Sequence, residues 1–173
     1  MPLPLTELAE IAGLNAPGGF SAVEAYATHR EAMHTQRQRF DPPVAMRVAL
    51  GETVSAADYI RMLQRRRDWI ARVTQRLQGF DAVVCPTSPI TAPTIADMLG
   101  TDEAFFKANS LLLRNTFTIN FLDGCSFSLP CHTPGELPVG LMLSAPGGHD
   151  AALAAVALAV EALLQPAAAR AVR

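Results

Sequence analysis

FDAVVCPTSPITAPTI, residues 80–95, is the stretch that decides the fold class. Its first half, Asp81–Cys85, is short, β-branched at its centre and stopped by a proline, which is typical of a strand buried on both faces. Because proline fixes the backbone angle φ, the side chains of Thr87, Ser88 and Pro89 are held where the chain places them. We expect this strand end to form either a rigid crossover loop or one wall of a substrate pocket.

Two helical segments are expected before this strand. The first begins at Ser21, which has capping-box spacing to Glu24, and ends at Pro42–Pro43. The second begins at Ser55, carries an apolar stripe opposite an arginine-rich side, and ends at Gly79 in a left-handed cap. The predicted stripe consists of Ile60, Leu63, Ile70, Val73 and Leu77.

After residue 95 the pattern alternates between helices and strands. Residues 101–115 and 149–164 have helical patterns, and the continuous apolar content of the second predicts deep burial. Residues 125–129 and 139–143 have strand patterns, and a turn-rich connection at 132–137 joins them. Helices around a small sheet indicate an α/β fold with a partial mixed sheet flanked by helices.

Composition shifts divide the chain into four expected regions. A Pro-Gly-Gly turn closes an N-terminal segment, residues 1–19, and a helical region follows at 20–78. The α/β region covers 79–165, and an alanine-rich tail covers 166–173. The region at 79–165 contains the predicted strands, so we expect it to carry the binding site.

Charge and cysteine content exclude several function classes. A net charge of -2 gives no basic surface for nucleic acid, so we expect no nucleic-acid partner. The longest apolar run, 151–164, contains Glu161 and is too short to span a membrane. Three cysteines without paired or metal-type spacing, and no leader pattern, favour a reduced cytoplasmic protein without metal or cofactor.

Polar residues precede the strand expected at 125–129. Asn120 and Asp123 lie among apolar residues, where such side chains commonly satisfy loop backbone groups. Substrate contact is the alternative, so both are candidates for the pocket. Cys131 and His132 are adjacent, and neighbouring residues of a strand point to opposite faces, which argues against a thiol–imidazole pair.

Four pieces of the sequence resemble the C-terminal portion of the amidase signature enzymes. They occur in the order found in that family, and each carries a family motif such as Pro-Thr-x-Pro or Leu-Pro-x-Gly. The pieces are FDAVVCPTSPITAPTI (80–95), NFLDGCSFSLPC (120–131), LPVGLMLSAP (137–146) and DAALAAVALAVEALL (150–164). The resemblance implies the C-terminal part of that fold and hydrolysis of a carbon–nitrogen bond in a small amide.

The resemblance also implies catalytic groups that this sequence cannot supply. Family members use a serine nucleophile in a Gly/Ser-rich N-terminal stretch, with a second serine and a lysine as its proton relay. This chain has no adjacent serines, and its single lysine is Lys107. A serine hydroxyl needs a base to become nucleophilic. We therefore assign no catalytic residue and expect the chain alone to be inactive.

Two hypotheses follow. The first is a C-terminal fragment or subunit of an amidase, supplying sheet and pocket wall to a complementary N-terminal half that completes the site for a small amide. The second is a non-catalytic small-molecule-binding or protein-interaction domain. Unpaired sheet edges invite association, so a homo-oligomer is also expected under the second hypothesis.

Overall fold

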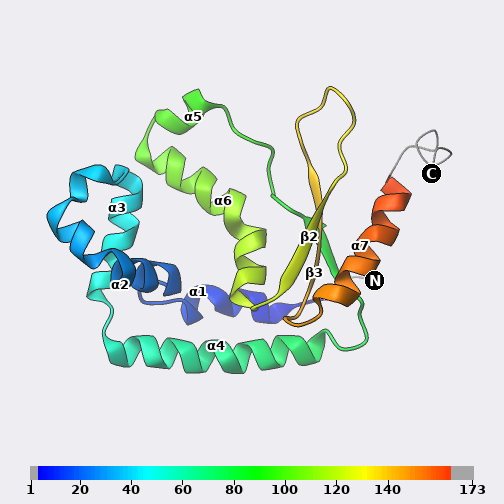
Figure 1. Cartoon of the computed structure of the whole chain (residues 1–173), viewed down its shortest axis with the longest axis horizontal. Coiled ribbons are helices and arrows are strands. Elements are labelled where there is room, and N and C mark those ends of the chain that lie inside the picture. Colours follow the sequence, from blue (N-terminus) through cyan, green and yellow to red (C-terminus); the bar gives the residue numbers. More distant parts are fainter. Residues whose placement is uncertain (1–3, 165–173) are drawn as a thin grey trace. The chain divides into compact units, whose positions relative to one another are not determined.

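The computed structural model describes residues 4–164 and is shown in Figure 1. The chain divides into two compact units between Val73 and Thr74, which are described separately. The tail expected at 166–173 lies outside the described residues. Within the described range, no helix is both long and apolar enough to cross a membrane.

The first unit is helical. A hydrophobic cluster of Met33, Ala45 and Val48 joins α2 to α3. Trp69 of α4 is fully buried, and its indole N–H donates to the carbonyl of Glu7 at 2.8 Å. The elements are η1 (Thr6–Glu10), α1 (Ile11–Leu14), α2 (Phe20–Thr35), η2 (Arg37–Arg39), α3 (Pro42–Ala49), η3 (Leu50–Thr53) and α4 (Ala56–Arg76), which runs past the boundary between the units.

The start of α2 differs from the predicted capping box. The cap is Gly19, whose φ of 85° is open to glycine, and Ser21 already lies inside the helix. The amide of Phe20 donates instead to the side-chain oxygen of Asn15 at 3.1 Å. Pro42–Pro43 begin α3 rather than end α2, because the first helical positions need no N–H partner. The capping-box prediction and the predicted helix end are both wrong.

The boundaries of α4 agree with the sequence. The Ser55 hydroxyl accepts from the Asp58 amide at 3.0 Å, which confirms the predicted start. Gly79 has a φ of 85°, as expected for a left-handed cap. These two signals are local, so they depend little on what the helix packs against.

The buried stripe of α4 is only partly the predicted one. Val73 and Leu77 are buried as expected, but Ile60 and Leu63 are 54% and 42% exposed. Met62 and Trp69 are buried in addition. The helix therefore buries a face rotated from the predicted one, and this face includes the large indole ring of Trp69.

The second unit contains the sheet. The helices are α5 (Ile95–Leu99), α6 (Asp102–Phe121) and α7 (Asp150–Leu164), and the strands are β1 (Val83–Pro86), β2 (Cys125–Pro130) and β3 (Gly140–Ala145). The strand order is β1-β3-β2, and both pairings are antiparallel. Helices around a small sheet confirm the α/β class, and the sheet of the described residues is antiparallel rather than mixed.

The helices α6 and α7 lie on opposite sides of this sheet (Figure 1). A cluster of Leu129, Leu143 and Ala145 from the sheet packs against Leu153 and Ala157 of α7. Side chains alternate across a strand, so the serines of β2 lie on the other face. There the Ser126 hydroxyl meets the buried Ser144 hydroxyl at 2.9 Å.

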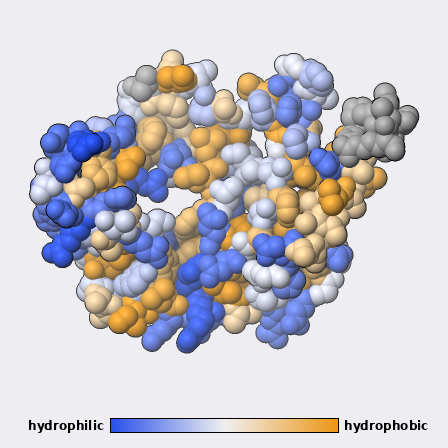
Figure 2. All heavy atoms as spheres, in the orientation of Figure 1, coloured by the Kyte–Doolittle hydropathy of each residue, from blue (hydrophilic) through white to orange (hydrophobic). Residues whose placement is uncertain are grey.

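Two predicted burials are wrong. Val84 of β1 is 56% exposed, because β1 is an edge strand that α7 does not cover fully. Leu158 and Leu163 of α7 are 66% and 70% exposed. Figure 2 shows apolar residues gathered over α7. This helix buries one face and leaves another apolar face open.

The helix α6 is longer than the sequence predicted. Thr101 caps it by accepting from the Ala104 amide at 3.1 Å, and the helix continues to Phe121 instead of ending at Asn115. The short helix α5 was not predicted, although Thr94 caps it in the same way. The extension places Asn120 on a helix rather than in a loop.

Candidate functional site

A cleft of about 540 Å³ opens where β1 ends and the β2–β3 hairpin begins. Its lining comes from the 86–91 segment, the end of β2 and the start of β3. The lining residues are Pro86, Thr87, Ser88, Pro89, Ile90, Thr91, Ser128, Pro130, His132, Pro138, Val139 and Gly140. None of these is Asp, Glu, Lys or Arg, so this wall is apolar with a few hydroxyls.

The 86–91 segment is fixed to its surroundings by three hydrogen bonds. The Asn115 amide nitrogen donates to the Pro86 carbonyl at 2.7 Å, and the Ser88 hydroxyl donates to a carbonyl of α6, that of Leu112, at 3.0 Å. The Thr87 amide donates to the Gly140 carbonyl at 2.8 Å. The segment is thus held by α6 on one side and by β3 on the other.

The hydroxyls of Thr87 and Ser128 form a pair 2.5 Å apart. The pair sits over Gly140, where an added Cβ would lie 2.5 Å from the Ser128 oxygen and 2.6 Å from the Thr87 oxygen. One hydroxyl donates to the other, so the pair offers a ligand one remaining O–H and free lone pairs. The Ser88 hydroxyl already donates its hydrogen to Leu112.

Among the described lining residues, His132 is the only one with a titratable side chain. Its Nδ1 lies 3.4 Å from both the carbonyl oxygen and the amide nitrogen of Val139. The Cys131 thiol donates to the same carbonyl at 3.5 Å. Both side chains therefore use Val139 as partner, and this geometry supplies no thiol–imidazole pair for nucleophilic catalysis.

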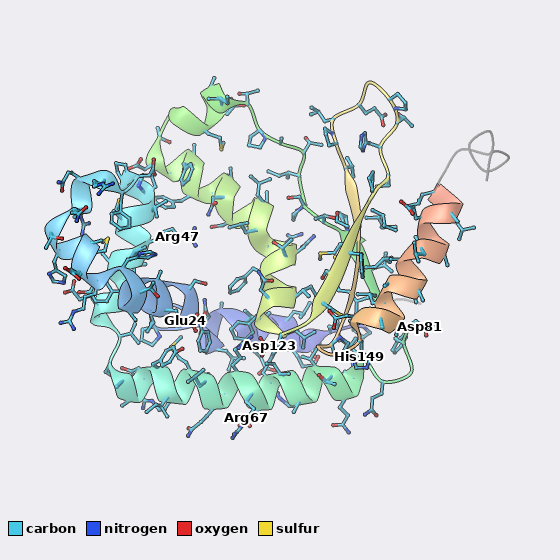
Figure 3. All side chains as sticks on the ribbon, in the orientation of Figure 1. Glu24, Arg47, Arg67, Asp81, Asp123 and His149 are labelled. Carbon is cyan, nitrogen blue, oxygen red and sulfur yellow. The ribbon has the colours of Figure 1, made fainter. Side chains whose placement is uncertain are left out.

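Asn120 and Asp123 lie at the other end of β2. Asn120 is in the last turn of α6, and Asp123 forms the turn into β2 with a φ of 55° (Figure 3). The turn packs closely, since a Cβ on Gly147 would lie 2.4 Å from the Asp123 carbonyl oxygen. The structure thus brings Thr87, Ser88 and Pro89 together in the cleft and separates them from Asn120 and Asp123.

Sequence reasoning did not identify Ser128, His132 and Gly140 as cleft residues. The alternating small and large residues of 125–129 placed Ser128 on the polar face of its strand, which was a usable signal. Gly140 gave no such signal, because its need for a missing Cβ appears only when the two hydroxyls meet above it. Across residues 4–164, no group of three or more His, Cys, Asp or Glu side chains could hold a metal ion.

Comparison with known proteins shows which family this chain belongs to. The sequence profile of the Amidase family matches residues 10–154. The chain belongs to the amidase family. The match confirms the family expected from the four sequence pieces, and it extends into the helical region before them.

Several proteins resemble this member of the amidase family in sequence. The 2-amino-5-chloromuconic acid deaminase of Comamonas testosteroni is 33% identical over 165 residues, which are 93% of this chain and 35% of the deaminase. A glutamyl-tRNA(Gln) amidotransferase subunit of Streptomyces coelicolor is 32% identical over 152 residues, which are 84% of this chain and 29% of that polypeptide. The chain spans about a third of the length of these curated relatives.

Solved structures show the same fold. A crystal structure of an amidase matches with a TM-score of 0.66 and 24% identity, covering 89% of this chain and 35% of that one. A structure described as an unexpected vestigial protein complex, revealing the evolutionary origins of an s-triazine catabolic enzyme, matches with a TM-score of 0.65 and 22% identity. The matched region covers 87% of this chain and 33% of the chain in that structure.

Proposed function

We propose that this amidase-family chain supplies part of the sheet and one wall of the substrate pocket of an enzyme that hydrolyses a carbon–nitrogen bond in a small amide. The observation that carries the proposal is the cleft whose wall, residues 86–91, is fixed by three hydrogen bonds. A wall held in this way can orient a substrate without first losing conformational entropy. The candidate contacts are Thr87, Ser88 and Pro89, with Asn120 and Asp123 as more distant candidates.

In this proposal the chain contributes binding but no catalytic group. Amide hydrolysis by a hydroxyl requires a base that removes its proton and donors that stabilise the oxyanion. The cleft lining contains hydroxyls, but the titratable group among its described residues, His132, is turned to the backbone of Val139. The nucleophile and its relay come from a complementary polypeptide in the region that the relatives have beyond the match, and no cofactor is needed.

The names of relatives support this division of labour. One is named as a deaminase of 2-amino-5-chloromuconic acid, and others are named as parts of an amidotransferase. A structural neighbour is described as a protein complex. From these names and this description we propose that the substrate is a small amide and that a complementary chain completes the enzyme. A cytoplasmic location is part of the same proposal, supported by three free cysteines in the described range.

A chimera tests the proposed function. Residues 10–154 of this chain replace the matched region of the Comamonas testosteroni deaminase, and ammonia release is measured on the deaminase substrate and on simple carboxamides. We expect the chimera to release ammonia and the isolated 173-residue chain to release none. Ammonia release by the isolated chain would contradict the proposal that it lacks catalytic groups. A folded but inactive chimera would contradict the proposal that this chain forms a wall of the substrate pocket.

A matched pair of variants links activity to the wall. Removing both hydroxyls of the pair, Thr87→Ala with Ser128→Ala, should raise KM of the chimera roughly tenfold, the loss of about one hydrogen bond to the substrate. The control Thr118→Ala removes a hydroxyl that only bonds the Arg114 carbonyl within α6, and should leave KM unchanged.

The second candidate is a non-catalytic binding or interaction domain. The observation that favours it is the exposed apolar face of α7, with Leu158 and Leu163 at 66% and 70% exposure. Patches of this kind mark interaction sites. Size-exclusion chromatography with light scattering over a hundredfold concentration range tests it, because a strict monomer that also binds no small amide would exclude this candidate.

A further inference from the structure

One ring nitrogen of His132 is engaged by the backbone of the β2–β3 hairpin. The imidazole Nδ1 lies 3.4 Å from both the amide nitrogen and the carbonyl oxygen of Val139. That carbonyl already accepts from the Cys131 amide at 3.0 Å and from the Cys131 thiol at 3.5 Å. A carbonyl oxygen has two lone pairs, and these two donors use both of them. The Val139 amide is therefore the partner that remains for Nδ1.

This hydrogen bond fixes the tautomer of the neutral ring. Because the Val139 amide donates, Nδ1 of His132 accepts and carries no proton. A neutral imidazole then has its proton on Nε2. Among the described residues, no group is hydrogen-bonded to Nε2 of His132, and this residue lines the cleft. The Nε2–H group is thus a donor that a molecule bound in the cleft can use.

The imidazole and the hydroxyl pair lie at different points of the same cleft wall. Alternate residues of the chain, Ser128, Pro130 and His132, line the cleft, as expected where an extended chain points every second side chain to one face. At about 3.3 Å per residue, the Cα atoms of Ser128 and His132 are roughly 13 Å apart. The wall therefore has two polar points, with a proline between them.

The charges around the imidazole favour an anionic ligand. The described cleft lining contains no carboxylate that would pair with a protonated His132. Glu136 follows in the same connection, but its carboxylate accepts from the Thr133 amide at 3.0 Å and does not line the cleft. The hydrogen bonds from Thr133 lower the pKa of Glu136, and the charge of His132 adds to this effect. The Nε2–H donor is left for a ligand.

We propose that His132 binds a carboxylate of the substrate, so that the small amide carries an acidic group at the end remote from the bond that is cleaved. This inference rests on the proposed function and names the substrate class of the same cleft. Nε2–H donates to a carboxylate oxygen, the hydroxyl pair faces the amide end, and Pro130 and Pro138 contact the carbons between them. His132 is a specificity-determining residue and takes no part in bond cleavage.

Protonation of His132 should strengthen this binding. Imidazoles ordinarily become charged between pH 8 and pH 5. The added proton goes to Nδ1, which then donates to the Val139 carbonyl and displaces the weak thiol bond of Cys131. Nε2 keeps its proton, and the carboxylate gains a positively charged partner. Affinity for an ionised carboxylate should therefore rise as the pH falls through this range.

NMR spectroscopy of the full chain tests the tautomer and the ligand separately. The probe is adipamate, in which four methylene groups join an amide to a carboxylate, and the matched control is 6-oxoheptanamide, in which a methyl ketone replaces the carboxylate. Without ligand at pH 8, long-range proton–nitrogen spectra should show His132 protonated on Nε2. At pH 5.5, adipamate should shift the His132 signals and bind at least tenfold more tightly than the ketone, with a smaller ratio at pH 8.

Three variants assign the effect to Nε2. His132→Asn keeps an acceptor for the Val139 amide but has no atom at the Nε2 position, and should weaken adipamate binding at least tenfold. His132→Gln offers a neutral N–H near that position, and its adipamate affinity should be the same at both pH values. The control His149→Gln changes a ring that faces the Pro146 and Gly147 carbonyls, and should bind like the unaltered chain. Circular dichroism verifies folding, and if a His132 variant does not fold, the titrations of the unaltered chain decide.

Several outcomes would overturn the inference. They are a neutral His132 protonated on Nδ1, equal affinity for adipamate and the ketone, no adipamate-induced shift at His132, and unchanged binding by His132→Asn. An active chimera with any of these results would leave the proposed function standing. An inactive chimera with adipamate bound at His132 would refute the function and retain the carboxylate site.

Discussion

The hydroxyl oxygens of Thr87 and Ser128 lie 2.5 Å apart although 41 residues separate them in sequence. Thr87 directly follows β1 and Ser128 belongs to β2, and their hydroxyls meet across the central strand, above Gly140. This contact ties the rigid 86–91 segment to the β2–β3 hairpin. The cleft is therefore shaped by a pairing that neither strand could make alone.

Gly140→Ala should separate this pair. The new Cβ would come within 2.6 Å of both oxygens, so one hydroxyl must move away. We expect a loss of about 1–3 kcal/mol in the free energy of unfolding, measured by urea denaturation. In the Thr87→Ala, Ser128→Ala background the same substitution should cost clearly less, and an equal cost in both backgrounds would show that the pair is not what excludes a side chain.

Asn115→Leu should release the 86–91 segment from α6. The substitution removes the donor to the Pro86 carbonyl, a bond of 2.7 Å, and should cost about 0.5–1.5 kcal/mol of stability. Limited proteolysis should also cut within 86–91 at a higher rate. Thr116→Ala, which removes a hydroxyl bonded only to the Leu113 carbonyl of α6, is the control and should leave the cleavage rate unchanged.

The pair of Glu10 with Arg72 should make the first unit sensitive to acid. The hydrogen bond from Arg72 lowers the pKa of Glu10 below its ordinary value of 4.5, against an opposing effect of burial. A lowered folded-state pKa gives stability that is present above pH 4.5 and is lost as the pH falls through the folded pKa.

Comparison with Glu10→Gln isolates this effect. The urea midpoint of the unaltered chain should exceed that of the variant at pH 7, and the difference should vanish at acidic pH. Because both partners are exposed, we expect the difference to be small. A difference that persists unchanged to pH 2 would assign the loss to packing of the side chain rather than to its charge.

The three free cysteines should react in a fixed order. Cys131 is exposed, whereas burial raises the pKa of the Cys85 thiol, opposed in part by the charge of Arg114. Less Cys85 is then present as the reactive thiolate. Peptide mass spectrometry after iodoacetamide at pH 8 should show Cys131 modified first and Cys85 last. Faster modification of Cys85 would mean that β1 opens readily to solvent.

Local signals in the sequence predicted much of the second unit and the start of α4 in the first. Pro86 marked the end of β1, the alternation in 125–129 marked β2, and Ser55 marked the start of α4. Each depends on residues within one turn or one strand. The amidase family followed from four such pieces in order, and the profile match confirms it.

Features set by distant contacts were not predictable in the same way. Ser21 has the spacing of a cap, yet Asn15 and Gly19 from the preceding turn form the start of α2. Val84 reads as buried, but β1 has a neighbour on one side only within the described residues. The cleft depends on the contact of Thr87 with Ser128 across β3, and no local sequence pattern predicts a contact between residues so far apart in the chain.

The strand order β1-β3-β2 has a consequence for the emerging chain. Within residues 4–164, each outer strand pairs only with β3, which is the last of the three to leave the ribosome. Val83 and Cys125 must therefore wait until Gly140–Ala145 has been synthesised before any ladder can close. Such non-local pairing slows folding, and it makes the sheet a late event that a stalled or shortened translation product could not reach.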